Sequence, residues 1–201
     1  MTTFRIQKLH ALVGGLKETT LVRDLVRDLE AKMKASGKPF EGAPMPVGLI
    51  ADRLPPGILS AWVFVLRPRT PTPAHQHPNS IQHMAVIQGG GLGLIGTKQF
   101  VLQPYDPAFP ERSVYVIPAG TAHAFEAGNE ILAVMSFHTV SAEDLVEVEV
   151  DTGISRTYVD TERRRRPSSE RKGGRAAGGS DRGPGGRRQR GPGDRRPKPK
   201  A

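Results

Sequence analysis

The chain has 201 residues, with 29 Lys and Arg, 20 Asp and Glu, and no cysteine. The lack of cysteine excludes disulfide bonds and thiolate metal ligands, and no run of about 18 apolar residues predicts a membrane span. The N-terminal residues lack the apolar core and cleavage site of a secretory signal, so we expect a cytoplasmic protein.

Charge and composition divide the chain at about residue 162. Residues 162–201 contain 15 basic and 4 acidic residues, whereas residues 1–161 carry a net charge of −2. The basic segment has no aromatic residue and no Leu, Ile, Val or Met, so it predicts a disordered tail. Its charge suits salt-dependent contacts with nucleic acid or another polyanion, and a solubilising appendage is the alternative.

The N-terminal part predicts one clear helix. Residues 1–18 fit either a short strand or a short helix, and the longer helix follows, with Thr20 as its candidate N-cap and Gly37 at its end. Its apolar positions follow helical spacing and are Leu21, Leu25, Val26, Leu29 and Met33. We expect this face to pack on the rest of the fold, with a homodimer contact as the alternative.

From Pro46 onward the pattern changes to short runs with a period of two. Candidate strands are 47–51, 58–66, 74–77, 82–88, 91–95, 99–102, 114–117, 122–126 and 131–138. Many short strands separated by Pro and Gly predict a sandwich or barrel. The strand 58–66 is apolar on both faces, which predicts a central position. A capped turn or a strand follows His138, and residues 154–159 predict one more strand.

The stretch from His75 to Gly89 carries the chemistry. His75 and His77 lie two residues apart, so in a strand both side chains point to the same face. Two converging neutral imidazoles form a partial shell for a divalent metal ion. A third imidazole, His123, follows the turn residues Pro118–Gly120. We therefore expect the strands to bring the three histidines together.

This stretch resembles the first of two motifs of the cupin superfamily. His75, His77 and Gly89 match that motif in residue type and spacing. Gln82 stands where the family usually has glutamate, and Arg69 stands where it has a leading glycine.

The second cupin motif is similar to the region around His123. Pro118–Gly120 and His123 match it, whereas Arg112 replaces its leading glycine and Ala127 stands at its asparagine position. The two half-motifs occur in the family's order and about forty residues apart.

The resemblance implies a mainly β fold with a single cupin-type barrel, also called a double-stranded β-helix or jelly roll. We assign residues 1–44 to an N-terminal helical extension that packs on the barrel, 45–161 to the barrel, and 162–201 to the tail. Cupins are often dimers, so a homodimer is expected by analogy.

The resemblance also implies a metal shell of His75, His77, Gln82 and His123. Two alternatives stay open: Gln82 only lines the cavity, or His83 is the fourth ligand. Strand parity favours Gln82, because it then shares a face with the apolar residues two and four positions later. All four ligands are neutral, so a bound divalent ion would keep its full charge.

A neutral shell predicts a strong Lewis acid and isomerase- or lyase-type chemistry on an oxygen-rich anionic small molecule. Zn²⁺, Ni²⁺, Mn²⁺ and Fe²⁺ all suit imidazole ligands. The alternatives are an Fe-dependent cupin dioxygenase and a non-catalytic protein that binds or senses a ligand. The shell also resembles that of cupins that linearise unsaturated uronates, but Met135 and Ser141 replace the acid and arginine of those proteins.

His138 is the candidate proton-transfer residue, because it ends a strand that in this fold borders the cavity. The alternative is a histidine bonded to backbone or water at the end of a strand. Candidate residues for the cavity wall are Trp62, Tyr115, Phe125 and Phe137, with a place in the apolar core as the alternative.

Overall fold

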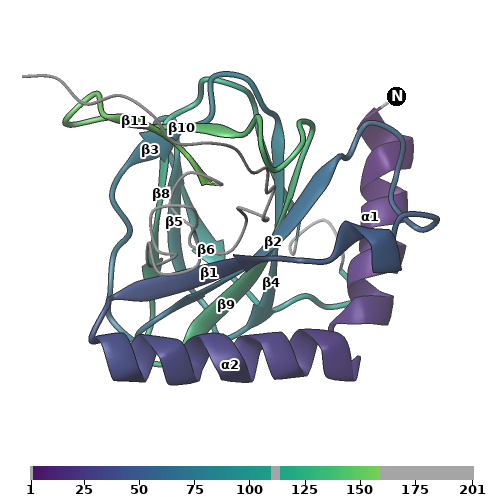
Figure 1. The fold of residues 1–201 in the computed structure, drawn as a ribbon, viewed down its shortest axis with the longest axis horizontal. Coiled ribbons are helices and arrows are strands. Elements are labelled where there is room, and N and C mark those ends of the chain that lie inside the picture. Colours follow the sequence, from purple (N-terminus) through teal and green to yellow (C-terminus); the bar gives the residue numbers. More distant parts are fainter. Residues whose placement is uncertain (1, 110–113, 159–201) are drawn as a thin grey trace, which may run out of the picture. The chain divides into compact units, whose positions relative to one another are not determined.

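The fold of the chain is described by a computed structural model, which covers residues 2–109 and 114–158 (Figure 1). The predicted tail, residues 162–201, lies outside the described residues. Mainly β structure is confirmed, with two antiparallel sheets and two α-helices in the described part. The elements are α1 (Thr2–Leu16), α2 (Thr20–Ser36), β1 (Phe40–Pro44), the 3₁₀ helix η1 (Val47–Leu49), β2 (Ser60–Leu66), β3 (His75–Gln76), β4 (Gln82–Gln88), β5 (Gly91–Ile95), β6 (Lys98–Leu102), β7 (Val114–Ile117), β8 (His123–Ala127), β9 (Leu132–His138), β10 (Val146–Glu149) and β11 (Ser155–Thr157).

The strands form a five-stranded and a six-stranded sheet. The five-stranded sheet has the order β1-β2-β9-β4-β7, and the six-stranded sheet has the order β11-β10-β3-β8-β5-β6. The predicted central position of residues 58–66 is confirmed, because β2 lies between β1 and β9. One cavity is lined by residues of both sheets, so the two inner faces enclose a common interior.

The five-stranded sheet separates two apolar clusters. On one face, Ala61, Val63 and Val65 of β2 pack with buried residues of α1 and α2. On the other face, Met84 and Val134 belong to the cluster that faces the six-stranded sheet. The alternation of buried side chains along each strand therefore produces a helix side and a cavity side.

The two N-terminal helices cover the helix side. Residues 2–16 form a helix, which resolves the ambiguity of the sequence pattern. In α2 the N-cap is Thr19, whose Oγ1 accepts from the N–H of Val22 at 3.5 Å, so the assignment of Thr20 was wrong by one position. Gly37 ends the helix with φ 71°, as the sequence predicted. No helix among the described residues is both long and apolar enough to cross a membrane.

The strand predictions need two corrections. Residues 47–51 form the short helix η1 and a following turn instead of a strand. Strand β1 was not predicted, because Gly42 and Pro44 are unusual in strands, but β1 lies at the sheet edge and pairs only with β2. After His138 both alternatives occur, as a turn over 142–144 and the strand β10.

Candidate metal centre

Sheet pairing brings the three predicted histidines together. His75 lies on β3 and is paired directly with His123, the first residue of β8. His77 follows one residue after the end of β3. His75 and His123, which lie 123 − 75 = 48 positions apart in sequence, therefore become neighbours through one antiparallel register.

The turn before His123 is attached to His77. The N–H of Thr121 donates to the carbonyl oxygen of Pro118 at 3.1 Å, and Gly120 adopts φ 70°, which favours glycine. The N–H of Gly120 donates to the carbonyl oxygen of His77 at 2.9 Å. This bond joins the two sequence motifs at the backbone, next to their imidazoles.

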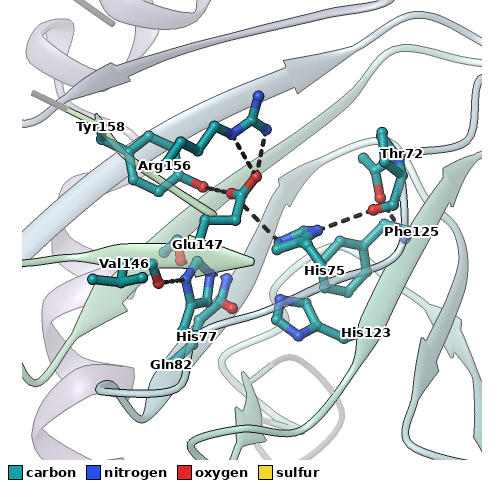
Figure 2. Close-up of polar contacts among 12 residues, drawn as sticks. Thr72, His75, His77, Gln82, His123, Phe125, Val146, Glu147, Arg156 and Tyr158 are labelled. Atoms are coloured by element: carbon teal, nitrogen blue, oxygen red, sulfur yellow. Dashed lines mark hydrogen bonds and ion pairs between the residues drawn. The ribbon is translucent and has the colours of Figure 1, made fainter. Parts of the chain in front are cut away.

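The three imidazoles form one cluster, and one ring nitrogen of each lies within 4.8 Å of the other two (Figure 2). The ring centroids of His75 and His123 are 4.2 Å apart, and that of His77 lies 5.3 Å from His75. His77 and His123 are buried, and His75 is partly buried. Among the described residues, these three are the His, Cys, Asp or Glu side chains whose ligand atoms lie close enough together to share one ion.

Backbone contacts set the tautomer of each ring. A carbonyl oxygen can only accept, so each bonded Nδ1 carries the proton and each Nε2 keeps its lone pair. The Nδ1 atoms of His75, His77 and His123 lie 3.0, 2.9 and 2.9 Å from the carbonyl oxygens of Pro73, Val146 and Thr121. Nε2 of His123 is buried and has no hydrogen-bond partner in the described part of the chain. It is thus an unused acceptor within the histidine cluster.

Gln82 provides a second unused acceptor. Its Nε2 donates to Oγ of Ser136 at 2.7 Å, and Oγ of Ser136 lies 2.9 Å from Nε2 of His138. Oε1 of Gln82 is buried without a partner among residues 2–109 and 114–158. The parity prediction is confirmed, because Gln82 lines the cavity, whereas His83 lies on the opposite face of β4.

Burial keeps the imidazoles of His77 and His123 neutral. Desolvation lowers the pKa of His123 to about 3 and lowers the pKa of His77, although the carbonyl bonds of both rings oppose the shift. Neutral imidazole is the form that binds metal ions. The unused Nε2 of His123 and Oε1 of Gln82 are oriented for a ligand, and the residues present fit a divalent metal ion.

A buried carboxylate that the sequence analysis missed lies beside the cluster. Oε2 of Glu147, on β10, is 3.9 Å from Nε2 of His75. Nε of Arg156 donates to Oε1 of Glu147 at 2.8 Å, and the hydroxyl of Tyr158 donates to Oε2 (Figure 2). Burial alone would raise the pKa of Glu147, but the nearby His75, the Tyr158 hydroxyl and Arg156 lower it overall, so the carboxylate is ionised at neutral pH.

The sequence carried a signal for Glu147 in the alternating run 145–150. Alternation places either the valines or the glutamates inside, and the valines are the usual choice. Leu145 shares a face with Glu147, and both are buried. Inward-facing Glu147 is compatible with burial because Arg156, its register partner on β11, bonds to it.

His138 borders the same cavity, but both of its ring nitrogens are hydrogen-bonded. Nδ1 lies 3.4 Å from Oγ of Ser80, and Nε2 contacts Ser136. Burial holds the pKa of His138 well below its usual value. Through Ser136 this ring orients the Gln82 amide, and its catalytic role stays a prediction.

Of the four aromatic residues considered for the wall, Phe125 lines the cavity. Phe137 belongs to the helix-side cluster, and the ring of Tyr115 packs against Phe100 at 6.0 Å. Trp62 packs against the Tyr158 ring at 4.8 Å.

The cavity next to the histidines is small and has walls of mixed polarity. The volume within which the centre of a water molecule can move is about 70 Å³. Its lining residues are Phe40, Phe64, Leu66, Thr72, Pro73, His75, His77, Gln82, Met84, Phe125, Val134, His138, Glu147, Arg156 and Tyr158.

Several solved structures resemble this fold. The cupin domain of Cnp3 from Schizosaccharomyces pombe is 14% identical, with a TM-score of 0.39 over 50% of this chain and 64% of that one. Oxalate oxidase in complex with the substrate analogue glycolate is 19% identical, with a TM-score of 0.42 over 56% and 55%. Salicylate 1,2-dioxygenase from Pseudaminobacter salicylatoxidans is 12% identical, with a TM-score of 0.45 over 58% and 32%. This chain spans less than two thirds of each of the three.

Comparison with curated protein sequences finds no match. The family model described as cupin matches residues 54–157, which is more than half of the chain and includes all three clustered histidines. The chain therefore belongs to the cupin family.

Proposed function

We propose that His75, His77, His123 and Gln82 bind one divalent transition-metal ion. The supporting observations are that the backbone holds each Nδ1 and that one ring nitrogen of each histidine lies within 4.8 Å of the other two. We further propose that the protein is an enzyme of isomerase or lyase type for a small anionic molecule.

Charge in the cavity supports an anionic substrate. Burial keeps the imidazoles of His77 and His123 neutral, the Gln82 amide carries no charge, and the charges of Glu147 and Arg156 offset each other. A Zn²⁺, Ni²⁺, Mn²⁺ or Fe²⁺ ion held by these residues would supply a positive charge that can polarise a carbonyl or enolate oxygen. The Gln82 amide adds no negative charge, which favours redox-neutral chemistry over dioxygen chemistry.

The chain's own residues supply orientation and proton transfer. Ser136 accepts from Nε2 of Gln82, and the amide oxygen is left buried without a hydrogen-bond partner among the described residues. The ionised Glu147 is placed to accept a proton from a molecule in the cavity, beside His75. His138 is the alternative proton acceptor, although its ring is held by two serines.

Elemental analysis of protein purified without added metal tests the proposal. We expect about one equivalent of a transition metal per chain and its loss in a His75→Ala, His77→Ala variant. A His83→Gln variant is the matched control, because this buried histidine lies on the other face of β4, and it should keep the ion.

Retention of the ion by the double variant would contradict the assignment. Substoichiometric metal in the unmodified protein would favour a non-catalytic ligand-binding protein. Oxygen consumption by the Fe²⁺-loaded protein would favour the dioxygenase.

A further inference from the structure

The inner face of the five-stranded sheet changes steadily from polar to apolar. At one end Gln82 and His138 are paired across β4 and β9. The next inward-facing pair is Met84 with Ser136, and the next after that is Val86 with Val134. Each step is two residues along the strand, or roughly 7 Å. The cavity therefore has its polar end at the histidines and its apolar end about two steps away.

Neighbouring strands extend the apolar end. Phe64 of β2 is paired with Val134, and both line the cavity. Leu66 and Phe40 complete this side, and Phe125 adds an aromatic ring from the six-stranded sheet. Apolar side chains from both sheets thus surround the part of the cavity away from the metal ligands.

The polar groups of the cavity are bonded mainly to one another. Glu147 accepts from Arg156 and Tyr158, and Ser136 connects Gln82 with His138. The Thr72 hydroxyl also lines the cavity, where its Oγ1 accepts from the N–H of Phe125 at 3.0 Å. A ligand hydroxyl beside Phe64, Leu66 and Val134 would lose its water without gaining a partner from those side chains, which is unfavourable. An apolar group at the same place would gain from burial.

We propose that the cavity takes a small acid with one anionic, oxygen-bearing head and a compact apolar body, and that it discriminates against polyhydroxylated acids. The anionic head of the ligand is inferred from the proposed metal site, so this part rests on the proposed function. The apolar body is inferred from the side chains of the cavity wall. The body must be compact, because the space open to the centre of a water molecule is only about 70 Å³.

Two probe acids with the same head test the body alone. 2-Hydroxy-4-methylpentanoate and threonate both carry an α-hydroxycarboxylate and have equal numbers of non-hydrogen atoms. Beyond the α-carbon the first acid has a branched chain of carbons only, whereas threonate has a shorter carbon chain with two hydroxyls. Titration calorimetry of the Zn²⁺-loaded full chain should show at least about tenfold tighter binding of the apolar acid. Equal affinities, a preference for threonate, or no binding of either acid would overturn the inference.

A substitution in the wall gives a second, independent readout. Val134→Thr is nearly isosteric and places a hydroxyl at the apolar end, so it should reduce the preference for the apolar acid at least about threefold. Val65→Thr is the matched control, because Val65 is also buried but lies on the helix side. An unchanged preference ratio in a folded Val134→Thr variant would place the ligand body elsewhere and overturn the inference.

Metal uptake separates this inference from the proposed function. A protein that binds no ion would contradict the metal site itself and remove the basis for the head. A protein that binds its ion and prefers threonate would contradict the apolar body alone.

Discussion

Arg69 has a backbone conformation that glycine normally provides. Its φ is 55°, and its N–H donates to the carbonyl oxygens of Gly128 at 2.8 Å and Ala127 at 3.1 Å. These bonds hold the chain in the left-handed region at the position where the first cupin motif has glycine. The Arg69 side chain adds one bond, from Nε to Oδ1 of Asn129 at 3.2 Å.

The comparison of Arg69→Gly with Arg69→Ala isolates the backbone effect. Both variants lose the same side-chain bond, and alanine at an ordinary position would be the more stable of the two. At Arg69 we expect the glycine variant to be more stable by about 1 kcal/mol, because positive φ is unfavourable for alanine. Urea unfolding measures the difference, and a more stable alanine variant would contradict the strained backbone.

Ser136 acts on the proposed metal site through Gln82. Ser136→Ala removes the bond that orients the amide, so we expect metal affinity to fall by about tenfold or more. Ser60→Ala is the control, because Ser60 is equally buried on β2 but bonds to the carbonyl oxygen of Val140. Competition with a chelating dye measures both affinities. Equal affinities in the two variants would exclude Gln82 from the shell.

At the scale of elements, the site depends on pairings that local sequence does not encode. Strand β3 has two residues, His75 and Gln76, and is held by β8 on one side and β10 on the other. A strand this short has little stability of its own. Its position next to β8 brings His75 to His123, and its position next to β10 brings the carboxylate of Glu147 to the same ring.

Helix α2 allows a test of one local assignment. Oγ1 of Thr19 accepts from the N–H of Val22, and its hydroxyl donates to the carbonyl oxygen of Leu16 at 2.6 Å. We expect Thr19→Ala to lower the free energy of unfolding by about 1 kcal/mol. Thr20→Ala should have little effect, because Thr20 is exposed and already helical. Thermal or urea unfolding compares the two, and the reverse order would restore Thr20 as the cap.

For the whole molecule, buried neutral histidines make stability depend on pH. Burial lowers the pKa of His83 from 6.5 to about 4, and the charge of Arg5 acts in the same direction. Above pH 6.5 both the folded and the unfolded chain have a neutral His83. Below that value His83 is protonated in the unfolded chain but stays neutral in the folded chain, so the free energy of unfolding falls as pH decreases toward about 4.

The His83→Gln variant should remove this contribution. Between about pH 7 and pH 5 we expect the metal-free protein to lose about 2 kcal/mol more unfolding free energy than the variant does. The other buried histidines also destabilise the fold at low pH, but they are present in both proteins, so most of their effect cancels in the difference. Parallel pH profiles from urea unfolding would show that His83 does not titrate in this range.

Local patterns in the sequence predicted much of the fold and most of the candidate shell. Helical spacing with Gly37 predicted α2, and alternation predicted which face of β4 carries Gln82. These features depend on neighbours within a few positions, which the sequence states directly. Strand β1 was missed because a glycine and a proline are acceptable only at a sheet edge, and edges are defined by topology.

The sequence by itself determined the cupin motifs and identified the candidate ligands His75, His77, Gln82 and His123. Only the tertiary structure decided that Glu147 faces inward, because burial of a carboxylate requires Arg156 and Tyr158 beside it. It also decided the polarity gradient from Gln82 to Val134, since that gradient depends on the register of strands that are distant in sequence. Spacing along the chain identifies chemical groups, whereas their burial and partners depend on long-range packing.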